Sequence, residues 1–235
     1  MVQRTAQVAR RATGVRGAFA EIGAVAVRSA INADALSEIV TLFDQLPPNQ
    51  AGLRLAPQSV RMLAGVQATT HYVRAVMSPS ARVVRALLFD KNPATNWALG
   101  WHQDRTIEVA ERRCVAGYGP WTVKAGRPHV APPVDLLTRM VTVRLHIDAV
   151  DAGNAPLIVA PGSHRLGLVP ESAIAAAVDA CGTLPCLAAA GDAWFYATLI
   201  LHASQPARRP THRRVLQLDY SDATLPGGLV WAGDT

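Results

Sequence analysis

This sequence has no long apolar run, few cysteines and few aromatic residues. No stretch approaches the roughly 18–20 consecutive apolar residues that cross a membrane, so no membrane association is expected. The segment from Met1 to Ala20 is rich in arginine but contains neither an apolar stretch nor a small-residue cleavage site. This argues against a secretory signal and leaves an organellar transit peptide as the alternative to the expected cytoplasmic location.

The three cysteines, Cys114, Cys181 and Cys186, are an odd number without the spacing of a metal finger. Reduced thiols in a reducing compartment are expected, with a Cys181–Cys186 pairing as the alternative. Only 17% of the residues are charged and 50% are hydrophobic, which excludes a disordered or fibrous chain. The sequence therefore predicts a globular protein with a substantial core.

Acidic residues are fewer than basic ones, since 17 Asp and Glu stand against 23 Lys and Arg and give a formal net charge of +6. Such a surplus raises the question of nucleic-acid binding. However, the basic residues are spread along the chain and aromatic residues make up only 6% of it, so a stacking platform for single strands is not expected. An anionic small substrate or co-substrate would use the same surplus.

The chain, at 235 residues, is long enough for one domain with a full core, and no composition break marks a second domain. Apolar residues at helical spacing predict a helix over 34–46, with Asp34 as a candidate cap. Strands are expected over 82–89, 139–147, 157–160, 193–202 and 214–220, and a further helix over 171–180. This pattern favours a mainly β fold with flanking helices, a double-stranded β-helix of the jelly-roll, cupin-like kind. Its helical N-terminal part would span about 1–80 and its β-barrel core about 82–226.

The expected strand over 139–147 alternates between two kinds of residue. Met140, Thr142, Arg144 and His146 form a mostly polar face, whereas the residues between them are aliphatic. A strand with a polar inner face suits a barrel that encloses a site rather than a dry core.

Trp101-His102-Gln103-Asp104 is the most informative segment. In a strand, residues i and i+2 point to the same side, so His102 and Asp104 can converge on one point. One imidazole and one carboxylate, completed by a second imidazole, form a facial triad that leaves positions open, as in non-haem iron(II) oxygenases. His202, at the end of the apolar run 193–201, is the best candidate for the third ligand. Taken alone, His202 fits a hydrogen-bonded core histidine better than a ligand.

Arg213 follows His202 by eleven residues, just inside the next expected strand. Its guanidinium can hold a carboxylate bidentately. A dicarboxylate such as 2-oxoglutarate, chelating iron through its keto-acid end, would need such a partner for its far carboxylate, and Ser204 could add a hydrogen bond. Arg214 competes for this role because adjacent residues of a strand face opposite sides.

The ordered set of motifs is more specific than any one of them. They are Leu88-Phe89-Asp90-Lys91, Trp101-His102-Gln103-Asp104, His146-Ile147-Asp148, Asn154-Ala155-Pro156-Leu157, Pro161-Gly162-Ser163-His164, Leu201-His202-Ala203-Ser204 and Arg213-Arg214-Val215-Leu216. In this combination the chain resembles a bacterial member of the phytanoyl-CoA dioxygenase family of Fe(II)/2-oxoglutarate oxygenases. The resemblance covers about Val84 to Pro226 and, more weakly, the helix over 34–46.

The resemblance implies a double-stranded β-helix with iron held by His102, Asp104 and His202. It also implies that Arg213, assisted by Ser204, binds the co-substrate 2-oxoglutarate, with O2 as the oxidant. Members of the family act on very different substrates, so the family name does not supply the substrate.

Gln103 and Arg144 would line the same pocket by this resemblance. Arg144 departs from the aromatic residue often found there, and Ala155 replaces the usual glycine of its motif. Halogenating relatives replace the metal carboxylate with a small residue. Because Asp104 is intact, hydroxylation or a related oxidation such as desaturation is expected.

The insert between the first ligands and the 139–147 strand is a candidate substrate segment, since long loops often bind ligands. Trp121, Lys124 and His129 are its candidates for contact with an anionic or polar substrate, and a solvated basic loop is the alternative. His146 is a further candidate on the polar face of the neighbouring strand.

The function expected is the hydroxylation of an unactivated C–H bond of a small, anionic metabolite, with release of succinate and CO2. Two alternatives stay open: a nucleic-acid oxidative demethylase of the same superfamily, and a catalytically silent β-barrel that binds a ligand. A small-molecule substrate is the expected partner, and the protein is expected to be a monomer or homodimer.

Overall fold

The computed structural model describes residues 16–47 and 49–234. Most of the arginine-rich segment, and with it the transit-peptide alternative, lies outside these residues. Within them, no helix combines the length and the apolar character needed to cross a bilayer. All three cysteines are free, so the Cys181–Cys186 pairing does not form.

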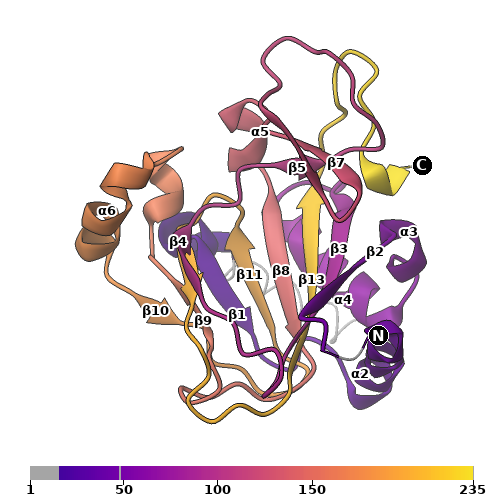
Figure 1. Ribbon diagram of the computed structural model, residues 1–235. Helices are drawn as coiled ribbons and strands as arrows, with labels where there is room; N and C mark the ends of the chain where they lie inside the picture. The colour runs from indigo at the N-terminus through magenta and orange to yellow at the C-terminus, as the bar shows by residue number, and fades with distance from the viewer. Residues whose placement is uncertain (1–15, 48, 235) are drawn as a thin grey trace.

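Three antiparallel sheets make up most of the fold (Figure 1). The largest has the strand order β1 (Ala24–Val27), β11 (Ala193–Ala197), β8 (Val141–His146), β13 (Arg213–Ser221), β3 (Arg82–Lys91) and β2 (Gly52–Leu55). The second has the order β10 (Leu184–Pro185), β9 (Leu157–Val159), β12 (His202–Ser204) and β4 (Leu99–His102). The third has the order β5 (Ile107–Glu108), β7 (Arg127–Val130) and β6 (Trp121–Lys124). The predicted jelly-roll fold is confirmed, but in the described part of the chain the sheets stay open and no closed barrel forms.

The helices are short and lie outside the sheets. They are α2 (Ala33–Val40), α3 (Pro57–Val60), α4 (Ala64–Val76), α5 (Val134–Thr138) and α6 (Ile174–Cys181), with 3-10 turns at Thr41–Gln45, Ser163–Leu166, Glu171–Ala173 and Ala232–Asp234. Ile39 of α2 and Val73 of α4 are fully buried in one core cluster with Val143 and Leu145 of β8. These helices therefore cover one face of the six-stranded sheet and leave its other face to the site.

The helix predicted over 34–46 exists in two parts. Asn32, not Asp34, is its cap: the Asn32 side chain accepts a hydrogen bond from the backbone N–H of Ala35 at 2.9 Å. An α-helix then runs to Val40 and tightens into a 3-10 turn before the two prolines. The second predicted helix likewise begins as a 3-10 turn and ends at Gly182, whose φ of 71° is in the left-handed region that glycine adopts easily.

The alternating pattern of 139–147 is realised in β8. Val141, Val143 and Leu145 lie in the helix-covered core. Arg144 faces the opposite side and lines a hollow. The period-two pattern thus identifies both the core and the functional face of the sheet.

The single strand predicted over 193–202 is wrong. β11 ends at Ala197 and belongs to the six-stranded sheet, whereas β12 begins at His202 and belongs to the four-stranded sheet. A turn between them, closed by the bond from Ile200 N–H to the Ala197 carbonyl at 2.9 Å, carries the chain from one sheet to the other. An apolar run alone does not reveal such a crossing, because both strands are buried.

The insert expected to be a long loop contains a β-hairpin, β6–β7. Its two-residue turn, Ala125–Gly126, has φ values of 50° and 74°. Two positive φ values in a row are typical of a type I′ turn, which matches the twist of a hairpin. The hairpin carries Lys124 and Arg127 at its tip, where the two residues are Cα partners.

Candidate active site

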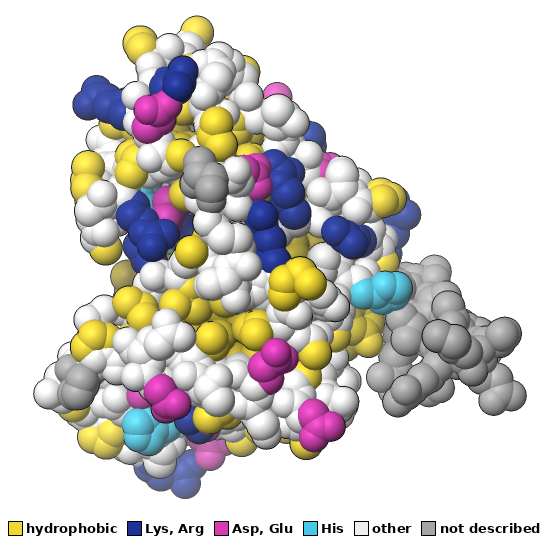
Figure 2. Space-filling model, turned by 90° about the vertical axis from the view of Figure 1, so that its right-hand side faces the viewer, with side chains coloured by type: hydrophobic (Ala, Val, Ile, Leu, Met, Phe, Trp, Pro, Cys, Tyr) yellow, Lys and Arg dark blue, Asp and Glu magenta, His cyan; other side chains and the backbone are white. Residues whose placement is uncertain are grey.

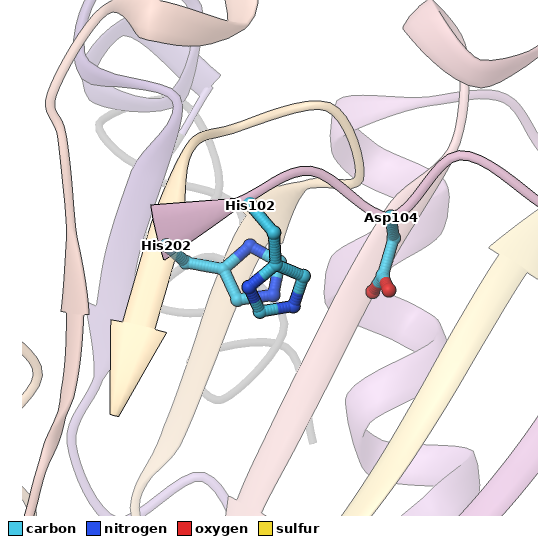
Figure 3. A group of neighbouring side chains, drawn as sticks. All are labelled: His102, Asp104 and His202. Carbon is cyan, nitrogen blue, oxygen red and sulfur yellow. The ribbon is translucent and has the colours of Figure 1, made fainter. Parts of the chain in front are cut away.

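His102, Asp104 and His202 come together at one point between the sheets (Figure 3). His102 ends β4 and His202 begins β12, and the two residues are direct partners across the antiparallel ladder. This register places their ring centroids 4.2 Å apart. Asp104 follows β4 by two residues, and the potential ligand atoms of all three side chains lie within 4.8 Å of one another. Strand pairing and the i, i+2 spacing therefore build the cluster that the sequence predicts.

Both imidazoles are oriented by backbone carbonyls. Nδ1 of His102 lies 2.7 Å from the Gly100 carbonyl, and Nδ1 of His202 lies 2.9 Å from the Ile200 carbonyl. A carbonyl only accepts, so each Nδ1 carries the proton and each Nε2 keeps a free lone pair. This arrangement is typical of metal-binding histidines, whose second nitrogen is fixed by an outer hydrogen bond.

Electrostatics keep His202 and Asp104 unprotonated near neutral pH. Burial lowers the pKa of His202 to about 4, although the Asp104 carboxylate opposes this. Burial disfavours ionisation of Asp104, but the Arg85 guanidinium and the two imidazoles outweigh it and lower the pKa of Asp104. Two imidazoles whose Nδ1 atoms face backbone carbonyls, together with one carboxylate, fit a non-haem iron(II) ion and leave positions for further ligands.

Arg85 connects the cluster to the sheet beneath it. Its Nε lies 2.6 Å from Asp219 and its Nη2 lies 3.8 Å from Asp104. Asp219 in turn accepts a hydrogen bond from the Thr142 hydroxyl at 3.1 Å. This buried chain of contacts holds the Arg85 cation beside the metal-binding carboxylate.

A hollow of about 180 Å³ opens over the cluster. Its lining residues are Arg54, Arg85, Leu87, Phe89, Trp97, Leu99, His102, Asp104, Lys124, Arg144, Leu157, His202, Ala203, Ser204, Arg213 and Gln217. Five of these are cations and one is a carboxylate, so the walls have an excess of positive charge.

Arg213 and Arg144 form the basic end of this hollow and are 2% and 8% exposed. Burial, and then repulsion from Arg144, lowers the pKa of Arg213 to about 9. Arg213 donates to the Ala155 carbonyl, and its Nη1 lies 3.4 Å from the Ser204 hydroxyl oxygen. Among the described residues neither arginine forms an ion pair, so both can receive an anion from the hollow.

Lys91 lies fully buried behind Ser204. Its ammonium donates to the Ser204 hydroxyl at 3.0 Å and to the carbonyls of Trp97 and Gln205, each at 2.7 Å. Burial, followed by repulsion from Arg213 and Arg144, lowers the pKa of Lys91 to about 7. Lys91 thus adds a third positive group to the basic end and fixes the hydroxyl of Ser204.

A family model described as Phytanoyl-CoA dioxygenase (PhyH) matches residues 19–215. The chain belongs to the phytanoyl-CoA dioxygenase family. Members of this family are 2-oxoglutarate-dependent non-haem iron oxygenases, so the predicted enzyme class and its cofactors, Fe(II) and 2-oxoglutarate, are confirmed. No match was found among curated proteins.

Solved structures share the fold at low sequence identity. SnoN, described as a non-haem α-ketoglutarate-dependent epimerase from nogalamycin biosynthesis, has a TM-score of 0.67 and 15% identity, covering 92% of this chain and 82% of its own. EctD from S. alaskensis in its apo form has a TM-score of 0.63 and 17% identity, covering 90% and 76%. HygX from Streptomyces hygroscopicus, with nickel and 2-oxoglutarate bound, has a TM-score of 0.59 and 12% identity, covering 86% and 84%. At these identities the likeness shows the fold alone.

Of the residues predicted for 2-oxoglutarate in this family member, Arg213, Ser204 and Arg144 line the hollow and Gln103 does not. The Gln103 amide donates to the carbonyls of Gly167 and Leu199 and accepts from the N–H of Val169. Gln103 points away from the cluster because it alternates with His102 and Asp104. It ties two loops together behind the site, so the prediction of its place is wrong.

Among the predicted substrate residues, only Lys124 lines the hollow. Trp121 packs under Arg112, whose guanidinium carbon lies 5.6 Å from the ring centroid. His129 is fully buried, with Nε2 3.6 Å from Glu108. His146 is also buried, with neither ring nitrogen hydrogen-bonded. None of these three side chains lines the hollow.

Sequence reasoning missed Arg54, Arg85, Phe89, Trp97 and Gln217. A signal existed for some of them, because Arg85, Leu87 and Phe89 alternate along β3 with residues of the core. The same alternation places Gln217 on the hollow side of β13, opposite Leu87 of β3. Trp97 lies in an irregular loop, and no period indicates its position.

Proposed function

We propose that this oxygenase hydroxylates an unactivated C–H bond of a small anionic metabolite, with conversion of 2-oxoglutarate to succinate and CO2. The observation that carries this proposal is the complete cluster of His102, Asp104 and His202 at the wall of a hollow whose cations outnumber its carboxylates. The intact carboxylate of Asp104 favours hydroxylation over halogenation.

Bound iron and 2-oxoglutarate supply the oxidising chemistry, and the chain binds and orients the reactants. Nε2 of both histidines and the Asp104 carboxylate would hold the metal. Their carbonyl and Arg85 contacts preset this geometry, so little reorganisation is needed on binding.

The distal carboxylate of 2-oxoglutarate would lie between Arg213 and Arg144. Each guanidinium donates in a planar fork, and an anion between them removes the repulsion of two buried cations. The Ser204 hydroxyl, whose oxygen accepts from Lys91, has its own proton free to donate to the same carboxylate. Lys124 lines the same hollow and is available to the substrate.

The first experiment measures succinate formation from 2-oxoglutarate under air, with Fe(II) and ascorbate, for wild type and Asp104→Ala. Turnover in wild type that is lost in the variant supports the proposal. The same samples are titrated anaerobically with Fe(II) and 2-oxoglutarate. Wild-type protein that neither turns over 2-oxoglutarate nor binds iron would contradict it and favour the silent ligand-binding barrel.

A further inference from the structure

A second, larger hollow of about 530 Å³ lies directly beside the metal-binding one. Four residues line both: Arg54, Leu87, Phe89 and Trp97. The two spaces therefore adjoin each other, one at the metal cluster and the other beside it at the edge strand β2. We refer to them as the inner and outer hollows.

The walls of the outer hollow are largely apolar and aromatic. Leu87 of β3 forms one side beside Gly52 of the edge strand β2, and the rings of Phe89 and Trp97 lie with centroids 6.3 Å apart at an interplanar angle of 41°. Such tilted rings offer faces and edges to an apolar or planar body. Ligand sites generally combine walls of this kind with a few placed polar groups.

The tip of the β6–β7 hairpin spans both hollows. Lys124 lines the inner hollow, and Ala125 and Arg127 line the outer one. Lys124 is near enough to Asp104, Arg85 and Arg54 for all three to influence its pKa, which burial lowers first. Lys124 therefore stands where the outer hollow meets the metal cluster.

Lys124 has no acidic partner among the described residues; its ammonium donates only to the Thr106 hydroxyl at 2.9 Å. The two other arginines at this junction have acidic partners, and Arg54 shares Glu108 with Arg127, which lies 2.8 Å from it. Arg54 lies 3.0 Å from Glu108, and Arg85 lies 2.6 Å from Asp219.

The formal charges do not balance once the cofactors bind. Asp104 and the 2-oxoglutarate dianion bring three negative charges against the two of Fe(II), and Arg213 offsets the one that remains. Arg144 and Lys91 also lie at the end of the hollow that would hold this carboxylate, whereas Lys124 has no ion-pair partner among the described residues. Lys124 is exposed, so its ammonium is available to an anion at the mouth of the inner hollow.

Building on the proposed function, we infer that the substrate is an amphipathic organic anion. Its single anionic group binds Lys124 at the mouth of the inner hollow, and its apolar or aromatic body lies in the outer hollow against Phe89 and Trp97. The bond to be oxidised then lies close to the anionic group, because Lys124 and the metal carboxylate of Asp104 face the same space.

The test uses protein loaded anaerobically with Fe(II) and 2-oxoglutarate, titrated calorimetrically with four probes. These are 3-phenylpropanoate, the matched alcohol 3-phenylpropanol, the matched amine 3-phenylpropylamine, and acetate, which has the anionic group without the body. We expect 3-phenylpropanoate to bind about tenfold or more tightly than each of the other three, since one charge-assisted contact is worth about that factor. Equal binding of the alcohol or amine, or no binding of 3-phenylpropanoate, would overturn the inference.

Lys124→Met and Arg208→Met form a matched pair for the same titration. Both remove one positive charge, but Arg208 is exposed and lines neither hollow. Lys124→Met should weaken 3-phenylpropanoate about tenfold and leave the alcohol unchanged, whereas Arg208→Met should change neither. Equal effects of the two variants would also overturn the inference.

Lysine-selective acylation gives a second measurement. Lys91 and Lys124 are the only lysines of the chain, and Lys91 is fully buried whereas Lys124 is exposed. Bound 3-phenylpropanoate should slow acylation of Lys124, measured by peptide mass, and 3-phenylpropanol should not. If the protein binds Fe(II) and 2-oxoglutarate tightly but acylation of Lys124 is not slowed, only the inference about the substrate is rejected. If the protein fails to bind the two cofactors, the proposed function is rejected.

Discussion

Arg213 and Arg214 are neighbours in sequence with opposite surroundings. Arg213 is 2% exposed and faces the inner hollow. Arg214 points to the other side of β13, where Nη2 and Nε lie 2.7 Å and 3.0 Å from the two oxygens of Asp148. The geometry therefore favours Arg213 as the partner of the 2-oxoglutarate carboxylate.

Replacing these two residues should separate their roles. Arg213→Leu should raise the KM for 2-oxoglutarate by about 100-fold, because losing one side of a buried charge pair costs roughly 2–5 kcal/mol. Arg214→Leu should change the KM less than about threefold, since it removes only a half-exposed ion pair. Succinate formation at varied 2-oxoglutarate measures both, and equal effects would contradict the assignment.

Lys91 should make 2-oxoglutarate binding depend on pH. Its pKa of about 7 means that the ammonium loses its proton as pH rises through neutrality. An anion bound nearby favours the charged form, so by linkage the affinity should be highest below about pH 7 and fall as the pH rises above it.

Calorimetric titration of Ni(II)-loaded protein at about pH 6 and about pH 8.5 measures this dependence. The dissociation constant of wild type should rise between the two conditions, and in Lys91→Arg, which keeps its charge, it should stay constant. A pH dependence that is the same in both proteins would assign the titration to another group.

At the scale of the element, one face of β8 contributes to stability, and the other contributes to the binding of 2-oxoglutarate. Leu145 is fully buried in the helix-covered core, and its neighbour Arg144 faces the hollow. Leu145→Ala should lower the free energy of unfolding by about 2–5 kcal/mol through the cavity that it leaves.

Arg144→Leu should weaken 2-oxoglutarate binding without lowering the free energy of unfolding. It removes a buried cation that repels Arg213, so the free energy of unfolding should hold or rise while 2-oxoglutarate binds more weakly. Urea denaturation and 2-oxoglutarate titration of both variants check the pair. A large loss of stability in Arg144→Leu would show that the arginine is structural.

An element could be predicted where the pattern of its residues distinguishes a buried face from a polar one. β8 has one face in the core and one toward the hollow, and its residues alternate accordingly. The run 193–202 is apolar throughout because both of its halves are buried, so nothing in it marks the turn at which the chain changes sheets.

Some site residues could likewise be predicted from the sequence, and others could not. His102 and Asp104 could be predicted because their spacing alone places them on one side of the chain. Arg54 could not, since its place depends on how β2 pairs at the edge of the large sheet. Gln103 could have been placed from the same spacing, because alternation puts its amide on the side opposite His102 and Asp104.

At the scale of the molecule, the site contributes Arg213, Arg144 and Lys124, which form no ion pair among the described residues, to the net charge of +6. The inner hollow alone has four more cations than carboxylates. On the face shown in Figure 2, Lys and Arg side chains are interspersed with acidic and hydrophobic ones instead of forming one patch. This distribution suits a small anion better than a nucleic-acid backbone.

Metal and co-substrate should stabilise the whole fold by mass action. At about 100 times the dissociation constant, a ligand adds roughly 2.7 kcal/mol, which corresponds to a Tm increase of about 5–10 °C for a chain of this size. Ni(II) with 2-oxoglutarate should produce this increase in wild type and in His71→Ala, which removes an exposed histidine outside the cluster. An equal increase in His202→Ala would mean that the metal binds elsewhere.

The pairing of His102 with His202 has a mechanical consequence. β4 is the edge strand of its sheet, it is only four residues long, and its ladder with β12 is irregular after the histidine pair. A metal ion bound to both rings would join β4 to β12 and hold this edge strand in place. Amide hydrogen exchange in 99–101 should therefore slow when Ni(II) binds, while exchange in the hairpin β6–β7 stays the same. Metal occupancy of the site could then be followed by the exchange of β4 amides, before any substrate is known.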